Sequence, residues 1–279
     1  MKRIVTIQDI SCVGKCSLTV ALPIISAMGV ECGIIPTAVL STHTMFKNFT
    51  CRDLTGEIEP IVDHWLSEGI DFDAVYTGYL GSFEQIDIVS GVFEKLKKQG
   101  SLIIVDPAMA DNGRLYPAFD EAFARRMASL CANADFVLPN ITEACFMTGR
   151  DYREEYDIDY VKGLMLALHD MGARNVVLTG VSFKEGKTGV MGYDGEKGEF
   201  SYYCHAKHPQ SYHGTGDIFS STFTGALMSG MDWRKAVMVA ADFTAECIRV
   251  TIDSGKEKHY GVDFEACIPY LLKRIAFEN

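Results

Sequence analysis

Short apolar runs alternate with segments of helical periodicity along the first two thirds of the chain. The run Leu102-Ile103-Ile104-Val105 contains no polar position, which is typical of a strand buried on both faces. The alternation predicts a mostly parallel sheet covered by helices. The predicted strands are Ile4–Gln8, Glu31–Pro36, Ala74–Tyr79, Leu102–Asp106, Phe136–Leu138 and Asn175–Thr179, and the predicted helices are Leu18–Met28, Glu59–Glu68, Gln85–Lys98, Phe119–Leu130, Glu143–Thr148 and Val161–Met171.

The pattern changes after Gly180. Thr188–Tyr193 and Phe200–Cys204 predict a hairpin around Asp194-Gly195, and three helices follow, over Ile218–Met228, Trp233–Val250 and Phe264–Ile275. No internal repeat, low-complexity stretch or Pro/Ser-rich linker divides the chain. We therefore expect residues 1–279 to form a single α/β domain with three layers, a central sheet between two layers of helices.

Composition excludes several classes of function. The chain has 26 basic and 37 acidic residues, a net charge of −11, which disfavours binding to nucleic acid. No apolar run approaches the ~18 residues of a membrane span. The opening Met1–Asp9 resembles a signal peptide for two residues only and is predicted to be a first strand. The nine cysteines are scattered without zinc-ligand spacing, so we expect reduced thiols and a cytoplasmic protein.

Several predicted strands end in polar or glycine-containing turns. In an open α/β sheet, ligands bind beyond the carboxyl ends of the strands, so these turns should gather at one edge. They are Gln8-Asp9, Tyr79-Leu80-Gly81-Ser82, Asp106-Pro107, Pro139-Asn140 and Thr179-Gly180.

The segment Gly214-Thr215-Gly216-Asp217 precedes a helix rich in small residues. Its glycines allow a tight turn whose N–H groups point at one spot, where the helix dipole adds positive potential. Such a turn suits the charge that develops on a transferred phosphoryl group, and Asp217 is placed to accept a proton from an attacking alcohol. The alternative is that Asp217 only caps the helix.

Two further carboxylates follow strands. Asn140 and Glu143 have capping-box spacing, or else they lie near phosphate and the water shell of a Mg²⁺ ion. Asp106-Pro107 is either an ordinary turn or places Asp106 on the phosphate and metal side.

Polar and aromatic side chains in two other turns suit a flat ligand. His43 and Thr44 offer hydrogen bonds, and the Tyr79 ring offers a stacking face, although each turn also fits a purely structural role. His205, His208 and His213 match no helical metal motif, so we interpret them as surface or lid residues. The P-loop and the Gly-x-Gly-x-x-Gly motif after the first strand are both missing.

Taken in order, these segments resemble the pyridoxal kinase family of the ribokinase-type superfamily, over nearly the full length. The Gly-Thr-Gly-Asp turn marks the superfamily, whereas the two middle segments are more specific to the vitamin B6 branch. The segments are Ile7-Gln8, Ser41-Thr42-His43-Thr44, Thr77-Gly78-Tyr79-Leu80-Gly81-Ser82, Asp106-Pro107-Ala108-Met109, Pro139-Asn140-Ile141-Thr142-Glu143 and Gly214-Thr215-Gly216-Asp217.

The resemblance implies MgATP-dependent phosphorylation of the 5′-hydroxymethyl group of pyridoxal, pyridoxine or pyridoxamine, with a monovalent cation such as K⁺, by a homodimer. It also implies a role for each matching residue. Asp217 is the base, Gly214, Thr215 and Gly216 form the anion hole, and Thr44 and Tyr79, with His43 beside them, are substrate contacts. Asp106, Asn140 and Thr179 lie on the nucleotide side, with Asp106 and Glu143 also on the metal side.

One position departs from the family pattern. After Ile-Gln, pyridoxal kinases often carry Ser, whereas this chain carries Asp9. An ionised carboxylate accepts but does not donate a hydrogen bond, so Asp9 would favour a cationic amine or a protonated pyridine nitrogen. This predicts a preference for pyridoxamine. The alternatives kept open are a hydroxymethylpyrimidine kinase of the same superfamily and a non-catalytic B6-binding protein.

Overall fold

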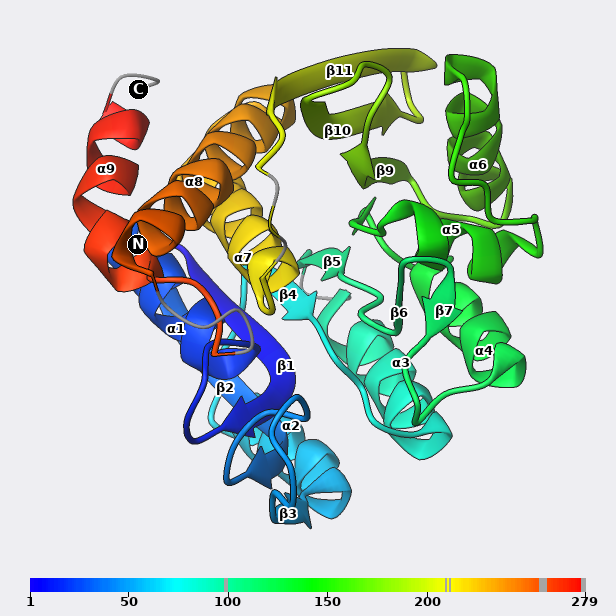
Figure 1. The fold of residues 1–279 in the computed structure, drawn as a ribbon. Coiled ribbons are helices and arrows are strands. Elements are labelled where there is room, and N and C mark those ends of the chain that lie inside the picture. Colours follow the sequence, from blue (N-terminus) through cyan, green and yellow to red (C-terminus); the bar gives the residue numbers. More distant parts are fainter. Residues whose placement is uncertain (98–99, 209, 211, 256–259, 277–279) are drawn as a thin grey trace.

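The computed structural model describes residues 1–97, 100–208, 210, 212–255 and 260–276, and its main feature is a nine-stranded sheet (Figure 1). Five neighbouring pairs are parallel and three are antiparallel. The strands, in spatial order, are β11 (Glu199–Ala206), β10 (Lys187–Asp194), β9 (Asn175–Val181), β8 (Phe136–Val137), β5 (Leu102–Val105), β4 (Ala74–Thr77), β1 (Arg3–Ser11), β2 (Glu31–Leu40) and β3 (Cys51–Asp53). The predicted mostly parallel sheet is confirmed.

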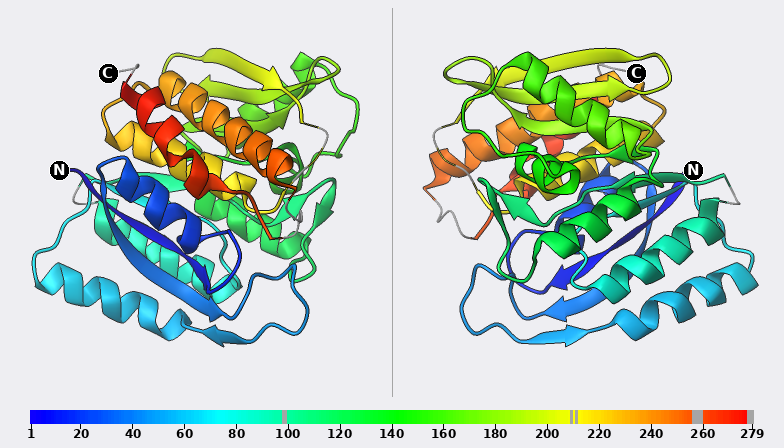
Figure 2. Two further views of the ribbon diagram at one scale, coloured as in Figure 1. Left: turned by 60° about the vertical axis from the view of Figure 1, so that its left-hand side comes forward. Right: turned by 90° about the vertical axis from the view of Figure 1, so that its right-hand side faces the viewer.

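Two layers of helices cover the sheet, one on each face (Figure 2). One layer contains α1 (Leu18–Ala27), α7 (Thr215–Met228), α8 (Trp233–Ser254) and α9 (Phe264–Ala276). The other contains α2 (Ile58–Ser67), α3 (Phe83–Lys97), α4 (Glu121–Cys131), α5 (Ile141–Thr148) and α6 (Ile158–Asp170), and a 3₁₀ turn at Thr55–Glu57 precedes α2. The three-layer α/β class is therefore as predicted.

The central strands are apolar throughout because each face of the sheet has its own core. In β5, Ile104 packs into the core beneath α1, α7 and α8, whereas Ile103 and Val105 pack into the core on the opposite side. Successive side chains of a strand point to opposite faces, so a strand covered on both sides needs an unbroken apolar run.

Side-chain caps fix where several helices begin. Asp120, Asn140, Asp157 and Asp232 each accept a hydrogen bond from a backbone N–H of the first turn that follows. These caps place the starts of α4, α5 and α6 within three residues of the predicted positions, although Phe119 precedes the observed start of α4. The predicted end of α3 at Lys98 lies outside the described residues.

Three local features differ from the sequence prediction. The strand predicted to reach Tyr79 ends at Thr77, so Tyr79 lies in the following loop. The short strands β3, β6 (Ala110–Asp111) and β7 (Arg114–Leu115) were not predicted, because runs of two or three residues carry no periodicity. The strands β10 and β11 extend one residue further into the turn than predicted: Asp194 pairs with Glu199, and the Asp194 carboxylate accepts the N–H groups of Glu196 and Lys197.

None of the described helices is long and apolar enough to cross a membrane. The longest, α8, has 22 residues and carries charged side chains along its length.

Candidate active site

The turns singled out in the sequence gather at the carboxyl ends of β9, β8, β5, β4 and β1, which are consecutive neighbours in the sheet. Asp9 lies near the end of β1, Tyr79 follows β4 and Asp106 follows β5. Asn140 follows β8 and forms an isolated parallel bridge with Thr179 of β9. The start of α7 lies over the same edge, because Ser220 of α7 donates a hydrogen bond to Asp106 at 2.7 Å.

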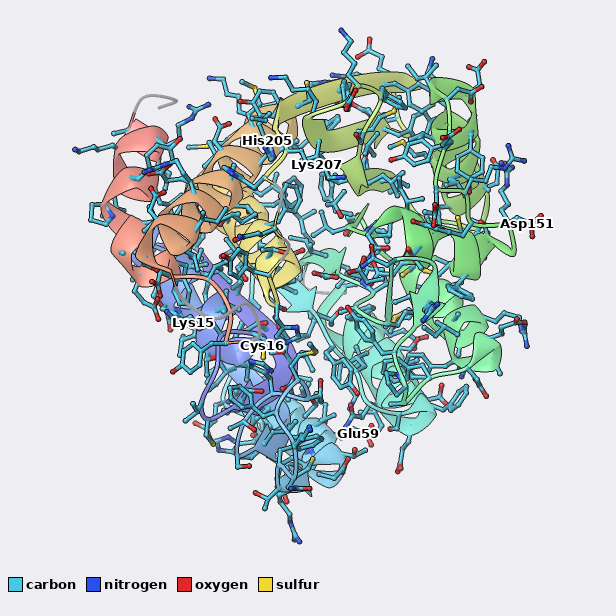
Figure 3. The ribbon with its side chains drawn as sticks, in the orientation of Figure 1. Lys15, Cys16, Glu59, Asp151, His205 and Lys207 are labelled. Carbon is cyan, nitrogen blue, oxygen red and sulfur yellow. The ribbon has the colours of Figure 1, made fainter. Side chains whose placement is uncertain are left out.

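The turn before α7 requires glycine at position 214. Gly214 is the residue before the first turn and has a φ of 81°, in the left-handed region. A Cβ at this position would lie 2.0 Å from the carbonyl oxygen of Lys15, in the loop after β1. Lys15 and Cys16, labelled in Figure 3, thus lie against the turn of the predicted anion hole.

Asp217 lies in the first turn of α7, and its environment disfavours the ionised form. Burial, followed by the nearby charge of Asp106, raises the pKa of Asp217 to about 8. The backbone N–H of Ser17 acts in the opposite direction, while Asp9 adds a further like charge. A carboxyl group with a pKa near 8 exchanges its proton close to neutral pH, as a general base requires.

Asp106 and Glu143 extend this group of carboxylates. Both are buried, with 6% and 3% of their surfaces exposed. Burial raises the pKa of Asp106 to about 6, and burial together with Asp106 raises the pKa of Glu143. Tyr116 belongs to the same neighbourhood, since burial and the charges of Glu143, Asp111, Asp106 and Asp217 raise its pKa.

Glu143 and Asn140 form the capping box that the sequence offered as one interpretation. The Asn140 side chain accepts the Glu143 N–H at 2.9 Å, and the Glu143 carboxylate accepts the Asn140 N–H at 2.8 Å. The other Glu143 oxygen accepts the N–H of Met109 at 3.1 Å, and the Asn140 amide donates to the Ala110 carbonyl. Glu143 is therefore suited to contact a metal through water rather than as a direct ligand.

No three His, Cys, Asp or Glu side chains in the described ranges are arranged to bind a metal ion by themselves. The residues nevertheless fit a cation held largely by phosphate and water. One oxygen of Asp106 is bonded to Ser220, and among the described residues no Lys or Arg forms an ion pair with Asp106, Glu143 or Asp217. Carboxyl groups without a cationic side-chain partner are the kind that a hydrated Mg²⁺ would pair with.

Asp9, Tyr79 and His43 lie on the β1 side of this edge. Burial raises the pKa of Asp9, and burial followed by the charge of Asp9 raises the pKa of Tyr79 to about 12. The Tyr79 ring packs against Phe119, with ring centroids 5.4 Å apart. The His43 ring packs in a tilted arrangement against the ring of His213, the residue before Gly214, with centroids 4.4 Å apart. His43 therefore touches the segment that leads into the Gly214–Asp217 turn.

Other predicted residues are placed less centrally. Thr44 is exposed, and Thr179 donates its N–H and hydroxyl to the Pro139 carbonyl beside Asn140. His213 is half-buried rather than a surface residue, and burial together with His43 lowers its pKa to about 4. His205 and His208 lie before it, on β11 and just after that strand.

Sequence reasoning missed Ser17, Cys16 and Ser220, which lie among these carboxylates. Ser17 and Cys16 belong to Gly14-Lys15-Cys16-Ser17, which is similar to the end of a P-loop but lacks the upstream glycine. Ser220 lies one helical turn after Asp217, and that spacing was the available signal that both side chains face the same direction.

Comparison with known proteins agrees with this geometry. The family model for phosphomethylpyrimidine kinase matches residues 24–263. Pyridoxal kinase of Dictyostelium discoideum is 26% identical over 92% of this chain and 91% of its own length. The crystal structure of pyridoxal kinase from Lactobacillus plantarum is 29% identical, with a TM-score of 0.89 over 98% of this chain and 97% of that one.

A third similar protein comes from Bacteroides thetaiotaomicron, where it was assigned as a phosphomethylpyrimidine kinase and crystallised with pyridoxal. It is 37% identical, with a TM-score of 0.91 over 97% of this chain and 95% of that one. The three-layer fold and the acidic site at the start of α7 define a kinase of the ribokinase type. The chain belongs to the phosphomethylpyrimidine kinase family, and its full-length similarity places it with the ribokinase-like pyridoxal kinases.

The raised pKa of Asp217 predicts a pH-dependent cost to stability. Its folded pKa of about 8 lies above the ordinary value near 4, so the folded protein holds this proton more tightly than the unfolded chain does. The free energy of unfolding therefore falls as pH rises from about 4 through about 8. We expect Asp217→Asn to raise Tm at pH 8, because the amide removes the free-energy cost of burying an ionised carboxylate. The rise should be roughly 2–4 °C for each kcal/mol of that cost.

This gain should shrink as the pH is lowered to 5, which calorimetry between pH 5 and 9 would measure. Asp159→Asn is the matched control, because Asp159 lies in the first turn of α6 but is exposed. An Asp217→Asn gain in Tm that stays constant over this pH range would contradict the prediction.

Proposed function

We propose that this kinase transfers the γ-phosphoryl group of ATP to the 5′-hydroxymethyl group of a vitamin B6 vitamer, giving the 5′-phosphate and ADP. The observation that carries the proposal is Asp217, a carboxyl group with a pKa near 8 in the first turn of α7, three residues after the left-handed Gly214. The similarity to pyridoxal kinases over nearly the full length supports the choice of acceptor.

In the proposed reaction, Asp217 accepts the proton of the hydroxymethyl group as its oxygen attacks the γ-phosphorus. The backbone N–H groups of Gly214, Thr215 and Gly216 face the phosphoryl oxygens, where the dipole of α7 stabilises the developing negative charge. Most of the acceleration comes from holding the two substrates in line and from fixed positive dipoles, as in other phosphoryl transfers.

The acceptor site is formed by Asp9, His43, Thr44 and Tyr79. Tyr79 offers its ring face to the pyridine ring, and His43 and Thr44 offer hydrogen bonds to the ring substituents. Asp9 lies close enough to Tyr79 and Asp217 for its charge to affect the pKa of each. A cationic group on the acceptor would therefore lie between carboxylates.

The nucleotide side is formed by Asp106, Asn140 and Thr179, with Asp106 and Glu143 facing the metal. Mg²⁺, when bound, would neutralise phosphate charge next to Asp106 and, through water, next to Glu143. Asp106 is held for this role by the Ser220 hydroxyl. A monovalent cation such as K⁺ is a further component, as in the family that the sequence resembles.

A second function has support from the family description. A hydroxymethylpyrimidine kinase would use the same base and glycine turn on a smaller ring, and the matching family model is that of phosphomethylpyrimidine kinase. A non-catalytic B6-binding protein would have no need of a carboxyl group tuned to neutral pH. Each alternative predicts a different pattern of ADP release when several acceptors are compared in one assay.

The test is ADP release with pyridoxal, pyridoxine, pyridoxamine and hydroxymethylpyrimidine measured side by side with MgATP. We expect turnover with the B6 vitamers and the highest kcat/KM with pyridoxamine, because its amine is cationic and Asp9 is an acceptor. Turnover confined to hydroxymethylpyrimidine would support the second function. ADP release with none of the four would support the binding protein.

Asp9→Ser is the control for the basis of the vitamer preference. It replaces the carboxylate with the hydroxyl that pyridoxal kinases often carry, so the ratio of pyridoxamine to pyridoxine turnover should fall by about tenfold, roughly the value of one charge-assisted hydrogen bond. An unchanged ratio would remove Asp9 from vitamer selection while leaving the kinase activity in place.

The setting proposed for this activity is a single-domain homodimer in the cytoplasm. The nine-stranded sheet contains every described strand except β6 and β7, which supports one domain. All nine cysteines are free thiols, which suits a reducing compartment. The dimer rests on the resemblance to pyridoxal kinases.

A further inference from the structure

The loop between β1 and α1 packs against the Gly214–Asp217 turn through the backbone of Lys15. Gly214 and Gly261 both have left-handed backbones, with φ of 81° and 108°. A Cβ added to Gly214 would lie 2.0 Å from the Lys15 carbonyl oxygen, and a Cβ added to Gly261 would lie 2.7 Å from the Lys15 Cβ. Three segments that are distant in the sequence therefore meet at one residue, and two of them approach it without a side chain.

The Lys15 side chain attaches this loop to residues 260–265, which lead into α9. Its ammonium group forms ion pairs with Asp263, at 3.1 Å, and with Glu265. The Lys15 N–H also donates to the Tyr260 carbonyl, at 3.2 Å. Lys15, labelled in Figure 3, thus contacts the same segment through its backbone and through its side chain.

Asp263, one of the two carboxylate partners, is itself fixed by the core. Its N–H donates to the hydroxyl of Thr251, in the last turns of α8, at 2.8 Å, and both residues are buried. Its neighbours Val262 and Phe264 pack into the core beneath α1, α7 and α8. The Lys15 ammonium group is therefore bonded to a point that cannot move without disturbing that core.

The burial of Lys15 distinguishes this contact from an ordinary surface ion pair. Its side chain is 14% exposed and that of Asp263 is 12% exposed, so water and salt screen the pair weakly. The ammonium group also lies over the Phe264 ring, 5.5 Å from the ring centroid. Burial acts to lower the pKa of Lys15, but the bonds to Glu265 and Asp263 raise it above its ordinary value, so the group is charged at neutral pH.

We propose that Lys15 is a positioning residue for the Gly214–Asp217 turn. Its ammonium group fixes the loop to residues 260–265, and its carbonyl then limits where the turn can lie, so that the amides of the turn stay aimed at the phosphoryl group. This inference rests on the role proposed above for those amides. It also gives a function to the segment Gly14-Lys15-Cys16-Ser17, which takes part in the site through the packing of Lys15.

Lys15→Met tests the role of the ammonium group, because it keeps most of the aliphatic side chain and removes the charge. The loop then loses its bond to Asp263, the amides of the turn lose their alignment, and kcat with pyridoxal should fall by about tenfold. KM for ATP and for pyridoxal should change by less than about threefold, since Lys15 acts through the turn. Lys15→Arg supplies a cation for both carboxylates and should return kcat to within about threefold of the native value.

Lys95→Met is the matched control for the loss of a lysine charge. Lys95 also forms ion pairs with two carboxylates, those of Asp63 and Glu59, but it lies on α3, in the helical layer on the other face of the sheet. The same substitution there should change Tm slightly and leave kcat unchanged. A kcat for Lys15→Met within about twofold of the native value, or a loss that Lys95→Met shares, would overturn the proposal.

Combining Lys15→Met with Gly214→Ala tests the contact between the loop and the turn. In the native protein the new Cβ overlaps a carbonyl that is held in place, whereas in Lys15→Met the loop is free to yield. Gly214→Ala should therefore cost at least about tenfold less kcat in the Lys15→Met background than in the native one, and equally much in the Lys95→Met background. Where Gly214→Ala lowers kcat, losses that simply multiply in the Lys15→Met double variant would overturn the proposal.

The Tm values of the same variants distinguish this inference from the proposed role of the amides, because Tm does not depend on activity. A drop in Tm from Gly214→Ala that is smaller in the Lys15→Met background supports the positioning contact, and equal drops overturn it. If Gly214→Ala keeps its kcat while the two drops differ, the proposed anion hole fails and the positioning contact stands. Lys15→Gln replaces Lys15→Met in every comparison if Lys15→Met does not fold, since its amide donates a hydrogen bond without carrying a charge.

Discussion

Asp217→Asn is expected to lower kcat with a B6 vitamer by roughly 10²–10⁴-fold while leaving the affinity for ATP unchanged. The amide has nearly the shape of the carboxylate but cannot accept the proton of the attacking hydroxyl. The glycine turn and the phosphate-side residues stay in place, so the nucleotide contacts persist. Steady-state kinetics with pyridoxal, together with calorimetric titration of ADP, would measure the two effects separately.

Asp159→Asn is again the matched control. It removes an acidic residue from the first turn of α6, where the only expected effect is a small change in helix stability. A near-normal kcat for Asp217→Asn would show that Asp217 only caps or polarises its helix. A loss of ATP affinity equal to the loss of kcat would place it on the nucleotide side instead.

Gly214→Ala is expected to lower both the activity and the stability of the protein. The new Cβ would lie 2.0 Å from the Lys15 carbonyl oxygen, in a residue whose φ is +81°. The left-handed backbone alone costs about 1 kcal/mol for alanine, and relief of the overlap must move either the turn or the loop after β1. Because we propose that the same amides face the phosphoryl group, we expect kcat to fall by roughly 10²–10³-fold along with a lower Tm.

Gly29→Ala is the control that separates the cost of a left-handed backbone from the cost of steric overlap at the new Cβ. Gly29 has a φ of +79°, close to that of Gly214, but a Cβ there would meet nothing within 4 Å. Its substitution should lower Tm by the cost of the left-handed backbone and leave kcat unchanged. If Gly214→Ala lowers Tm no more than Gly29→Ala does, and also keeps its kcat, then neither the Lys15 contact nor the position of these amides matters for catalysis.

The sequence determined the order of the elements and the residues at the ends of the strands. An apolar run such as Leu102–Val105 has one stable environment, a strand covered on both faces, so the three-layer class followed from the pattern. The carboxyl ends of parallel strands lie at one edge, which brought Asp9, Asp106 and Asn140 to the same site. The Gly-Thr-Gly-Asp motif indicated Asp217 as a candidate base, because the four residues of the motif are consecutive in the sequence.

Only the tertiary structure decided the pKa values of the carboxyl groups and the packing around the glycine turn. The pKa of Asp217 depends on burial and on Asp106, which is far away in the sequence and belongs to another element. Glycine is needed at position 214 because Lys15 packs against it, and Lys15 is in turn bonded to Tyr260, Asp263 and Glu265 at the other end of the chain. Periodicity and local propensity describe neighbours along the chain, whereas desolvation, repulsion between charges and steric overlap arise from groups that folding alone brings together.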